Sequence, residues 1–284
     1  MTDLSSLPSA PECFLGLLPA RLVDPNKKPA LTALADYMAL MRSIIDDPKM
    51  PPHLKPAYLT ALEGTLTTQE GYVPLPKGVP PTVIPPGFAL RRECDSRKIS
   101  VNHARRIVQA YRQDLTKARY RDWSELLAYF RFSAGACADY AVEVLGLDDE
   151  LASAVQALAL AHALMARGED AAGDLERVKK IYLPLRWLND AGLNSEEISF
   201  DDRTRWLKVR DQAVAQIRQL LAQSMNIKAI KDWRLRLAFA WAKAGLAVRC
   251  DALSAAETFP VAALPPPSRT RQALTCLRMF LQKA

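Results

Sequence analysis

The stretch ELASAVQALALAHALMARGED, from Glu150 to Asp170, decides the fold class of this chain. Its apolar side chains recur all the way around a helix rather than along one stripe, which is typical of a helix buried in a protein core. Alanine and leucine dominate the stretch, and both are strong helix formers. The sequence therefore predicts a long buried helix that ends in acidic residues and is surrounded by other helices.

Segments on both sides of this stretch repeat the spacing of helices. Loops are expected where proline is dense, over residues 70–87 and 259–267. No segment alternates apolar and polar residues as a half-buried strand does, so the predicted fold is all-α. The expected helices cover residues 30–45, 54–66, 87–98, 100–117, 123–146, 149–170, 203–224, 230–251 and 268–282.

Local signals set several boundaries. Ser100 and Asp122 are predicted N-caps, and Gly146 is the predicted end of a helix. We interpret residues 1–29 as an irregular lead-in and residues 30–284 as one helical domain. A boundary at the first proline-rich loop is rejected, because the roughly 70 residues before it would make a poor core alone.

The chain has 284 residues and a formal net charge of +7. Residues 91–121 contain ten basic and three acidic residues, and residues 203–249 contain eleven basic and two acidic residues. A basic surface suits an anionic partner such as a phosphate, a diphosphate or a membrane, although solvated helix faces would give the same pattern. Nucleic acid is disfavoured, since no zinc-finger spacing or aromatic RNA-binding motif is present.

The five cysteines are widely spaced and form no CxxC pair, which favours a reducing compartment without a disulfide framework. The first residues do not resemble a secretory signal, and no apolar run reaches 18 residues. We therefore expect a cytoplasmic protein, with peripheral contact to the inner membrane left open, or a protein on the matrix side of a mitochondrion if the source is eukaryotic.

Two acidic residues at the end of the long apolar helix form the first candidate site. Asp170 and Asp174 are four positions apart, so on a helix their carboxylates share a face, roughly 6 Å apart. Mg²⁺ would offset their repulsion and leave coordination positions for phosphate oxygens and water. Lys180 and Tyr182 follow closely. The alternative is a solvated helix end.

The stretch DLTKARYRDWSELLAYFRFSAG, from Asp114 to Gly135, forms the second candidate site. Lys117 and Arg119 could hold a diphosphate through charge-assisted hydrogen bonds. A salt-bridged surface helix would explain the same residues.

Together these stretches resemble the squalene/phytoene synthase family, which condenses two prenyl diphosphates head to head, and within it the bacterial hydroxysqualene synthases. The similarity runs from about Phe14 to about Leu281. In the first stretch the matching residues are Gln113, Asp114, Thr116, Lys117, Arg119, Tyr120, Asp122, Trp123, Glu125, Leu126, Tyr129, Arg131, Ser133 and Ala134. In the second they are Asp170, Asp174, Tyr182, Leu183, Pro184, Leu185, Leu188, Gly192 and Leu193.

The resemblance implies a single all-α isoprenoid-synthase bundle around a central cavity, where Mg²⁺ between two aspartate-rich motifs binds the substrate diphosphate. It also implies roles for individual residues. The metal ligands would be Asp170, Asp174 and Asp46, the substrate-binding residues Lys117, Arg119 and Lys180, and the catalytic residues Tyr129 and Tyr182.

The match breaks at the family's first aspartate-rich motif. Arg42 and Ser43 stand where acids are expected, and Arg42 would repel a cation rather than bind one. Ala166, Asp139 and Phe130 replace an asparagine, a base and a cysteine of the usual pattern. The scaffold is thus better kept than the metal chemistry.

Two functional hypotheses follow. The favoured one is a non-catalytic family member that binds an isoprenoid lipid or a protein, as relatives that act as assembly factors do, and that needs no cofactor. The alternative is an active enzyme that uses Mg²⁺ to ionise farnesyl or presqualene diphosphate. A nucleic-acid-binding helical domain rests on charge alone and is disfavoured.

Overall fold

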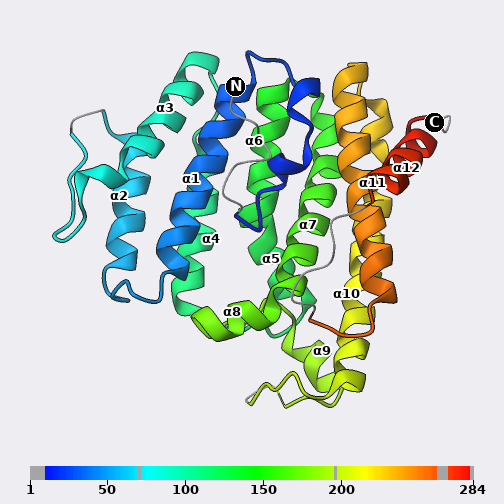
Figure 1. Cartoon of the computed structure of the whole chain (residues 1–284). Coiled ribbons are helices and arrows are strands. Elements are labelled where there is room, and N and C mark those ends of the chain that lie inside the picture. The colour runs from blue at the N-terminus through cyan, green and yellow to red at the C-terminus, as the bar shows by residue number, and fades with distance from the viewer. Residues whose placement is uncertain (1–9, 70–71, 195–196, 261–267, 282–284) are drawn as a thin grey trace.

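A computed structural model describes residues 10–69, 72–194, 197–260 and 268–281. Within these ranges the chain is helical and contains no strand, and the only β pairing is an isolated bridge between Tyr120 and Pro184. The all-α prediction is therefore confirmed (Figure 1). The helices are α1 (Lys28–Asp46), α2 (Lys55–Thr67), α3 (Pro85–Arg97), α4 (Asn102–Thr116), α5 (Trp123–Phe130), α6 (Ala136–Leu145), α7 (Ala152–Glu169), α8 (Ala171–Val178), α9 (Leu185–Asp190), α10 (Arg203–Gln223), α11 (Trp233–Ala255) and α12 (Arg269–Leu281).

Helix α7 lies at the centre of the bundle, as its apolar sequence predicts. It packs against α6 on one side and against α10 and α11 on the other. Leu158, Leu164 and Met165 are fully buried along it. Figure 1 shows α2 and α3 at one flank of the molecule and α11 and α12 at the opposite flank, with α1, α6 and α7 between them.

Two helix boundaries follow the sequence signals, and one does not. The Asp122 carboxylate accepts a hydrogen bond from the Glu125 N–H at 2.9 Å and caps α5. Gly146 ends α6 in the left-handed conformation, with φ at 63°. The prediction for Ser100 is wrong, because Val101 occupies the N-cap of α4, although the Ser100 hydroxyl still accepts a hydrogen bond from the Asn102 N–H at 3.2 Å.

The predicted helix over residues 123–146 is interrupted by a π-helical turn, Arg131–Gly135, that separates α5 from α6. The Ser133 hydroxyl donates a hydrogen bond to the Tyr129 carbonyl at 3.1 Å within this turn. Such turns insert one extra residue into a helix and are frequent at functional sites. Here the turn begins two residues after Tyr129, a side chain of the candidate site.

The acidic end of the long helix also differs from a continuous helix. Helix α7 ends at Glu169, and Asp170 lies at the junction with a separate short helix, α8. Asp174 therefore lies in the first turn of α8. The carboxylates still come from neighbouring turns of the backbone, but they point into different surroundings.

The described part of the lead-in packs against the bundle rather than leaving it. Its 3₁₀ turns, Phe14–Leu17 and Ala20–Leu22, contact α6, α7 and α11. Phe14 and Leu15 are fully buried. Figure 1 shows this dark blue segment crossing in front of α6 and α7.

No helix in the described ranges combines the length and the apolarity that crossing a bilayer requires.

Candidate functional site

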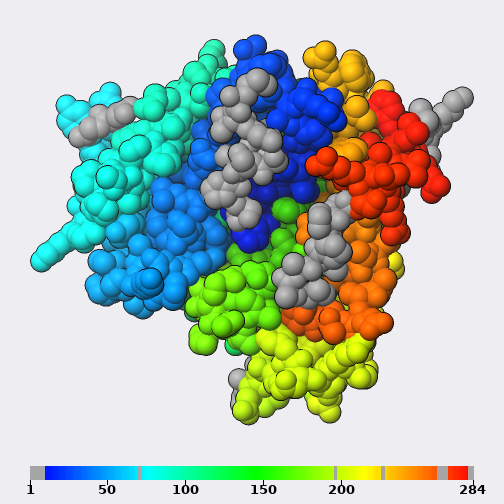
Figure 2. All heavy atoms as spheres, viewed as in Figure 1, coloured from blue at the N-terminus to red at the C-terminus, as the bar shows by residue number. Residues whose placement is uncertain are grey.

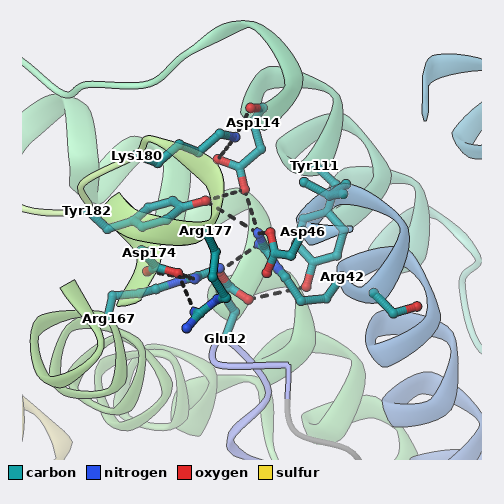
Figure 3. Close-up of polar contacts among 12 residues, drawn as sticks. Glu12, Arg42, Asp46, Tyr111, Asp114, Arg167, Asp174, Arg177, Lys180 and Tyr182 are labelled. Carbon is teal, nitrogen blue, oxygen red and sulfur yellow. Dashed lines mark hydrogen bonds and ion pairs between the residues drawn. The ribbon is translucent and has the colours of Figure 1, made fainter. Parts of the chain in front are cut away.

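The ends of α1, α4, α7 and α8 converge on a buried cluster of charged and phenolic side chains. Figure 3 shows these side chains pointing toward one another from these helices and from the non-helical segments beside them. We call this set the ion cluster. Its members, which are linked by hydrogen bonds and ion pairs, are Glu12, Arg42, Asp46, Tyr111, Asp114, Tyr129, Arg167, Asp174, Lys180 and Tyr182.

Arg42 of α1 is the first organising residue of the ion cluster. Its guanidinium donates hydrogen bonds to Asp114 Oδ2 and Glu12 Oε1, both at 2.9 Å. A weaker hydrogen bond, at 3.3 Å, reaches Asp46 on the next turn of α1. The Tyr129 hydroxyl lies 3.0 Å from the same guanidinium. A cation in a position expected to be acidic therefore has three carboxylate partners.

Arg167 of α7 is the second organising residue. Its Nη1 donates to both carboxylate oxygens of Asp174, at 3.1 and 3.0 Å. Its Nη2 and Nε donate to Glu12 Oε1, at 2.7 and 3.0 Å. The guanidinium carbon also lies 4.0 Å from the centre of the Tyr182 ring, a cation–π arrangement. Arg42 and Arg167 are both almost completely shielded from solvent.

Glu12 lies between the two guanidinium groups and is fully buried. Burial alone would raise the pKa of Glu12, but the charges of Arg167 and Arg42 outweigh burial and hold this pKa at about 2. The carboxylate is therefore ionised at any physiological pH, which makes it a permanent internal anion.

Asp114 of α4 is surrounded by hydrogen-bond donors. Tyr182 and Tyr129 donate their hydroxyls to Asp114 Oδ2 at 2.8 and 2.9 Å. Lys180 Nζ lies 3.7 Å from Oδ1 and also donates to the Asp114 backbone carbonyl. Both carboxylate oxygens are thus occupied by side chains of this chain.

Asp170 and Asp174 are linked by Arg177 rather than left free. Arg177 Nη2 donates to Asp170 Oδ2 at 2.5 Å and to Asp174 Oδ1 at 3.2 Å. The Asp170 and Arg177 side chains are 45% and 47% exposed, whereas Asp174 is fully buried. Burial raises the pKa of Asp174 to about 6, against the opposing charge of Arg167 and with the added repulsion of Asp170.

These carboxylates do not fit a Mg²⁺ ion in the arrangement described. Mg²⁺ requires carboxylate oxygens in near-octahedral geometry at about 2.1 Å. Both oxygens of Asp174 accept hydrogen bonds from Arg167, and Asp46 and Asp170 each pair with an arginine. Among the described residues, no group of three or more histidine, cysteine or acidic side chains could hold a metal ion. The assignment of Asp46, Asp170 and Asp174 as metal ligands stays a prediction that this geometry opposes.

The other predicted site residues divide into two groups. Tyr129, Tyr182 and Lys180 come together around Asp114. Lys117 instead pairs with Glu125, and Arg119 donates to the backbone carbonyls of residues 118 and 179 at 2.9 and 2.7 Å. The structure therefore brings one of the three predicted substrate-binding residues into the ion cluster.

Sequence reasoning missed Glu12 and Arg167. Arg167 carries a signal that could have found it, because a lone arginine in a long apolar helix must find an acidic partner when buried. Glu12 carries none, since it lies in a stretch of proline and turn-forming residues without helical spacing.

Comparison with known proteins gives consistent matches. The family model described as Squalene/phytoene synthase matches residues 17–263. The hydroxysqualene synthase of Rhodopseudomonas palustris is 27% identical over 218 residues, which cover 76% of this chain and 71% of that protein. The hydroxysqualene synthase of Sinorhizobium fredii is 25% identical, with coverage of 76% and 70%.

Solved structures agree on the fold. A dehydrosqualene synthase in complex with ligand superposes with a TM-score of 0.71 at 16% identity, covering 97% of this chain and 93% of that one. A squalene synthase from Alicyclobacillus acidocaldarius gives a TM-score of 0.60 at 18% identity, with coverage of 82% and 86%.

Proposed function

The chain belongs to the squalene/phytoene synthase family, and we propose that it is a member that binds an isoprenoid ligand without ionising its diphosphate. The observation that carries the proposal is the pairing of Arg42 and Arg167 with the buried carboxylates Glu12, Asp114 and Asp174, at 2.7 to 3.1 Å. Two guanidinium groups thereby supply the positive charge that metal ions would supply.

This exchange of charge matters for the chemistry. A metal ion stabilises a leaving diphosphate because it accepts oxygen ligands directly and brings two positive charges to the developing anion. A guanidinium that already donates to buried carboxylates has fewer N–H groups left for a substrate. An arginine also stays protonated, so Mg²⁺ beside it would meet a fixed positive charge. We expect a loss of about a thousandfold or more in the rate of ionisation.

Diphosphate release tests the proposal. Purified protein is incubated with farnesyl or presqualene diphosphate and Mg²⁺, and released diphosphate is measured, while binding of the same ligands is measured in EDTA. The proposal predicts binding in EDTA and no release above the protein-free rate. Release that depends on Mg²⁺ would overturn it.

A second candidate is a Mg²⁺-dependent enzyme that acts on a prenyl diphosphate, like the hydroxysqualene synthases. The similarity to two hydroxysqualene synthases over about three quarters of the chain supports it. Arg177 and Asp170 are half-exposed, so a substrate could rearrange this edge of the ion cluster. Turnover that is abolished both by EDTA and by Asp170→Ala would establish this candidate in place of the first.

A further inference from the structure

The donors around Glu12 converge on one point in space. Glu12 Oε1 faces Arg167 Nη2 at 2.7 Å, Arg42 Nη2 at 2.9 Å and Arg167 Nε at 3.0 Å. The Tyr129 hydroxyl lies 3.2 Å from the same oxygen. Glu12 Oε2, by contrast, meets the Tyr111 hydroxyl at 3.3 Å. Three guanidinium N–H groups directed at one oxygen form a preformed, positively charged site for an oxyanion, which we call the anion cradle.

The anion cradle needs a negative occupant. Arg42 and Arg167 are both buried and repel each other, as the effect of Arg42 on the pKa of Arg167 reflects. Asp114 and Asp174 neutralise the outer sides of the two guanidinium groups. Between the two guanidinium groups lies Glu12. Among the described acidic residues, Glu12 alone lies within ion-pair distance of both Arg42 and Arg167.

The occupant comes from outside the helical bundle. Glu12 belongs to the turn that the Cys13 N–H closes on the Ala10 carbonyl at 2.8 Å, and not to a helix. Withdrawal of its side chain therefore unwinds no helix. Figure 2 shows that the dark blue lead-in forms part of the outer face of the molecule, between the blue of α1 and the orange of α11.

We propose that Glu12 is a built-in substitute for an external phosphate-type oxyanion, and that such an anion exchanges with Glu12 in the anion cradle without a metal ion. Arginine matches phosphate oxygens through paired N–H donors, so the same cradle that holds one carboxylate oxygen suits a phosphate or a diphosphate group. The inference rests on the proposed function, because it takes arginine as the anion-binding group in place of Mg²⁺.

The test measures binding of inorganic diphosphate to the full chain in EDTA by calorimetry. An internal anion lowers the apparent affinity of an external one by the fraction of time that the cradle is open. Glu12→Ala should therefore bind diphosphate about tenfold or more tightly than the wild type. Glu12→Gln keeps the shape of the side chain and removes its charge, so it should show a smaller gain in the same direction. Addition of Arg167→Met to Glu12→Ala should abolish the gain.

A second measurement follows the lead-in of the wild type. Saturating diphosphate should speed amide hydrogen exchange in residues 10–18, because the displaced Glu12 no longer holds its turn. Equal diphosphate affinity of wild type, Glu12→Ala and Glu12→Gln, each shown to be folded by circular dichroism, would overturn the inference. Because EDTA is present throughout, this failure is separate from Mg²⁺-dependent turnover, which would overturn the proposed function. If Glu12→Ala does not fold, Glu12→Gln and the exchange measurement decide the question.

Discussion

At the residue scale, the ion cluster depends on two buried arginines whose loss would leave acids without partners. Arg167→Met should lower the free energy of unfolding by about 3 to 5 kcal/mol, because Glu12 and Asp174 would lose a buried counter-charge. Urea denaturation followed by circular dichroism measures the effect. The matched control is Arg186→Ala, since Arg186 is 75% exposed and 3.9 Å from Asp190. It should cost less than about 1 kcal/mol. Equal effects of the two substitutions would show that the buried pairs add no stability.

Glu12 also makes stability depend on pH. Its pKa in the folded chain is about 2, below the reference value of 4.5. A carboxyl whose pKa is depressed by folding stabilises the fold fully above its unfolded pKa, and this contribution is lost as pH falls toward the folded pKa. The wild type should therefore exceed Glu12→Gln in stability above pH 4.5, by on the order of 3 kcal/mol. The difference should shrink as the pH falls from 4.5 to 2. Urea titrations of both proteins across this range test it, and a constant difference would contradict it.

Residue-scale sequence reasoning found half of the ion cluster. Arg42 stands where an acid is expected, and its positive charge predicts that it repels a metal cation. One of its three carboxylate partners, Asp114, lies 72 positions away, and Glu12 lies 155 positions from Arg167. Contacts over such separations depend on how helices pack, and no local spacing encodes them.

At the element scale, helices were predictable where apolar spacing is continuous, as in α7 and α10. Their interruptions were not. The break at Asp170 and the π turn Arg131–Gly135 contain no proline, and their residues can all continue a helix. At the first break, Asp170 lies between α7 and α8, and Asp174 in the first turn of α8 pairs with Arg167 at 3.0 Å.

Close packing of α2 on α3 gives a further prediction. A methyl group added at Gly87 would lie 2.9 Å from Thr65 Cβ and closer still to its hydroxyl oxygen. Thr65 is fully buried, so it has little room to move. Gly87→Ala should destabilise the chain by about 1 to 3 kcal/mol in thermal or urea unfolding.

Two further variants check the cause. Thr65→Ala in the Gly87→Ala background should recover part of the loss, since it removes the atoms in contact. The matched control is Gly135→Ala, because the methyl group added there would meet its nearest neighbour at an ordinary 3.6 Å. A Gly87→Ala protein as stable as the wild type would contradict the close approach of the two helices.

At the scale of the whole molecule, the all-α fold and the family were predictable from sequence because they depend on patterns spread along most of the chain. The balance of charge inside the bundle was not, because it depends on which side chains meet. The family scaffold is retained, while arginines neutralise the carboxylates at the junction of α1, α4, α7 and α8. We infer that these guanidinium groups take the place of metal ions.

Titration with Mn²⁺ distinguishes guanidinium groups from metal ions at this site, with free Mn²⁺ followed by electron paramagnetic resonance in the presence of inorganic diphosphate. We expect the wild-type protein to remove no more Mn²⁺ from solution than the Asp174→Asn variant does. Stoichiometric Mn²⁺ binding by the wild type that is lost in Asp174→Asn would contradict this inference. Asp174 would then coordinate a metal ion instead of pairing with Arg167.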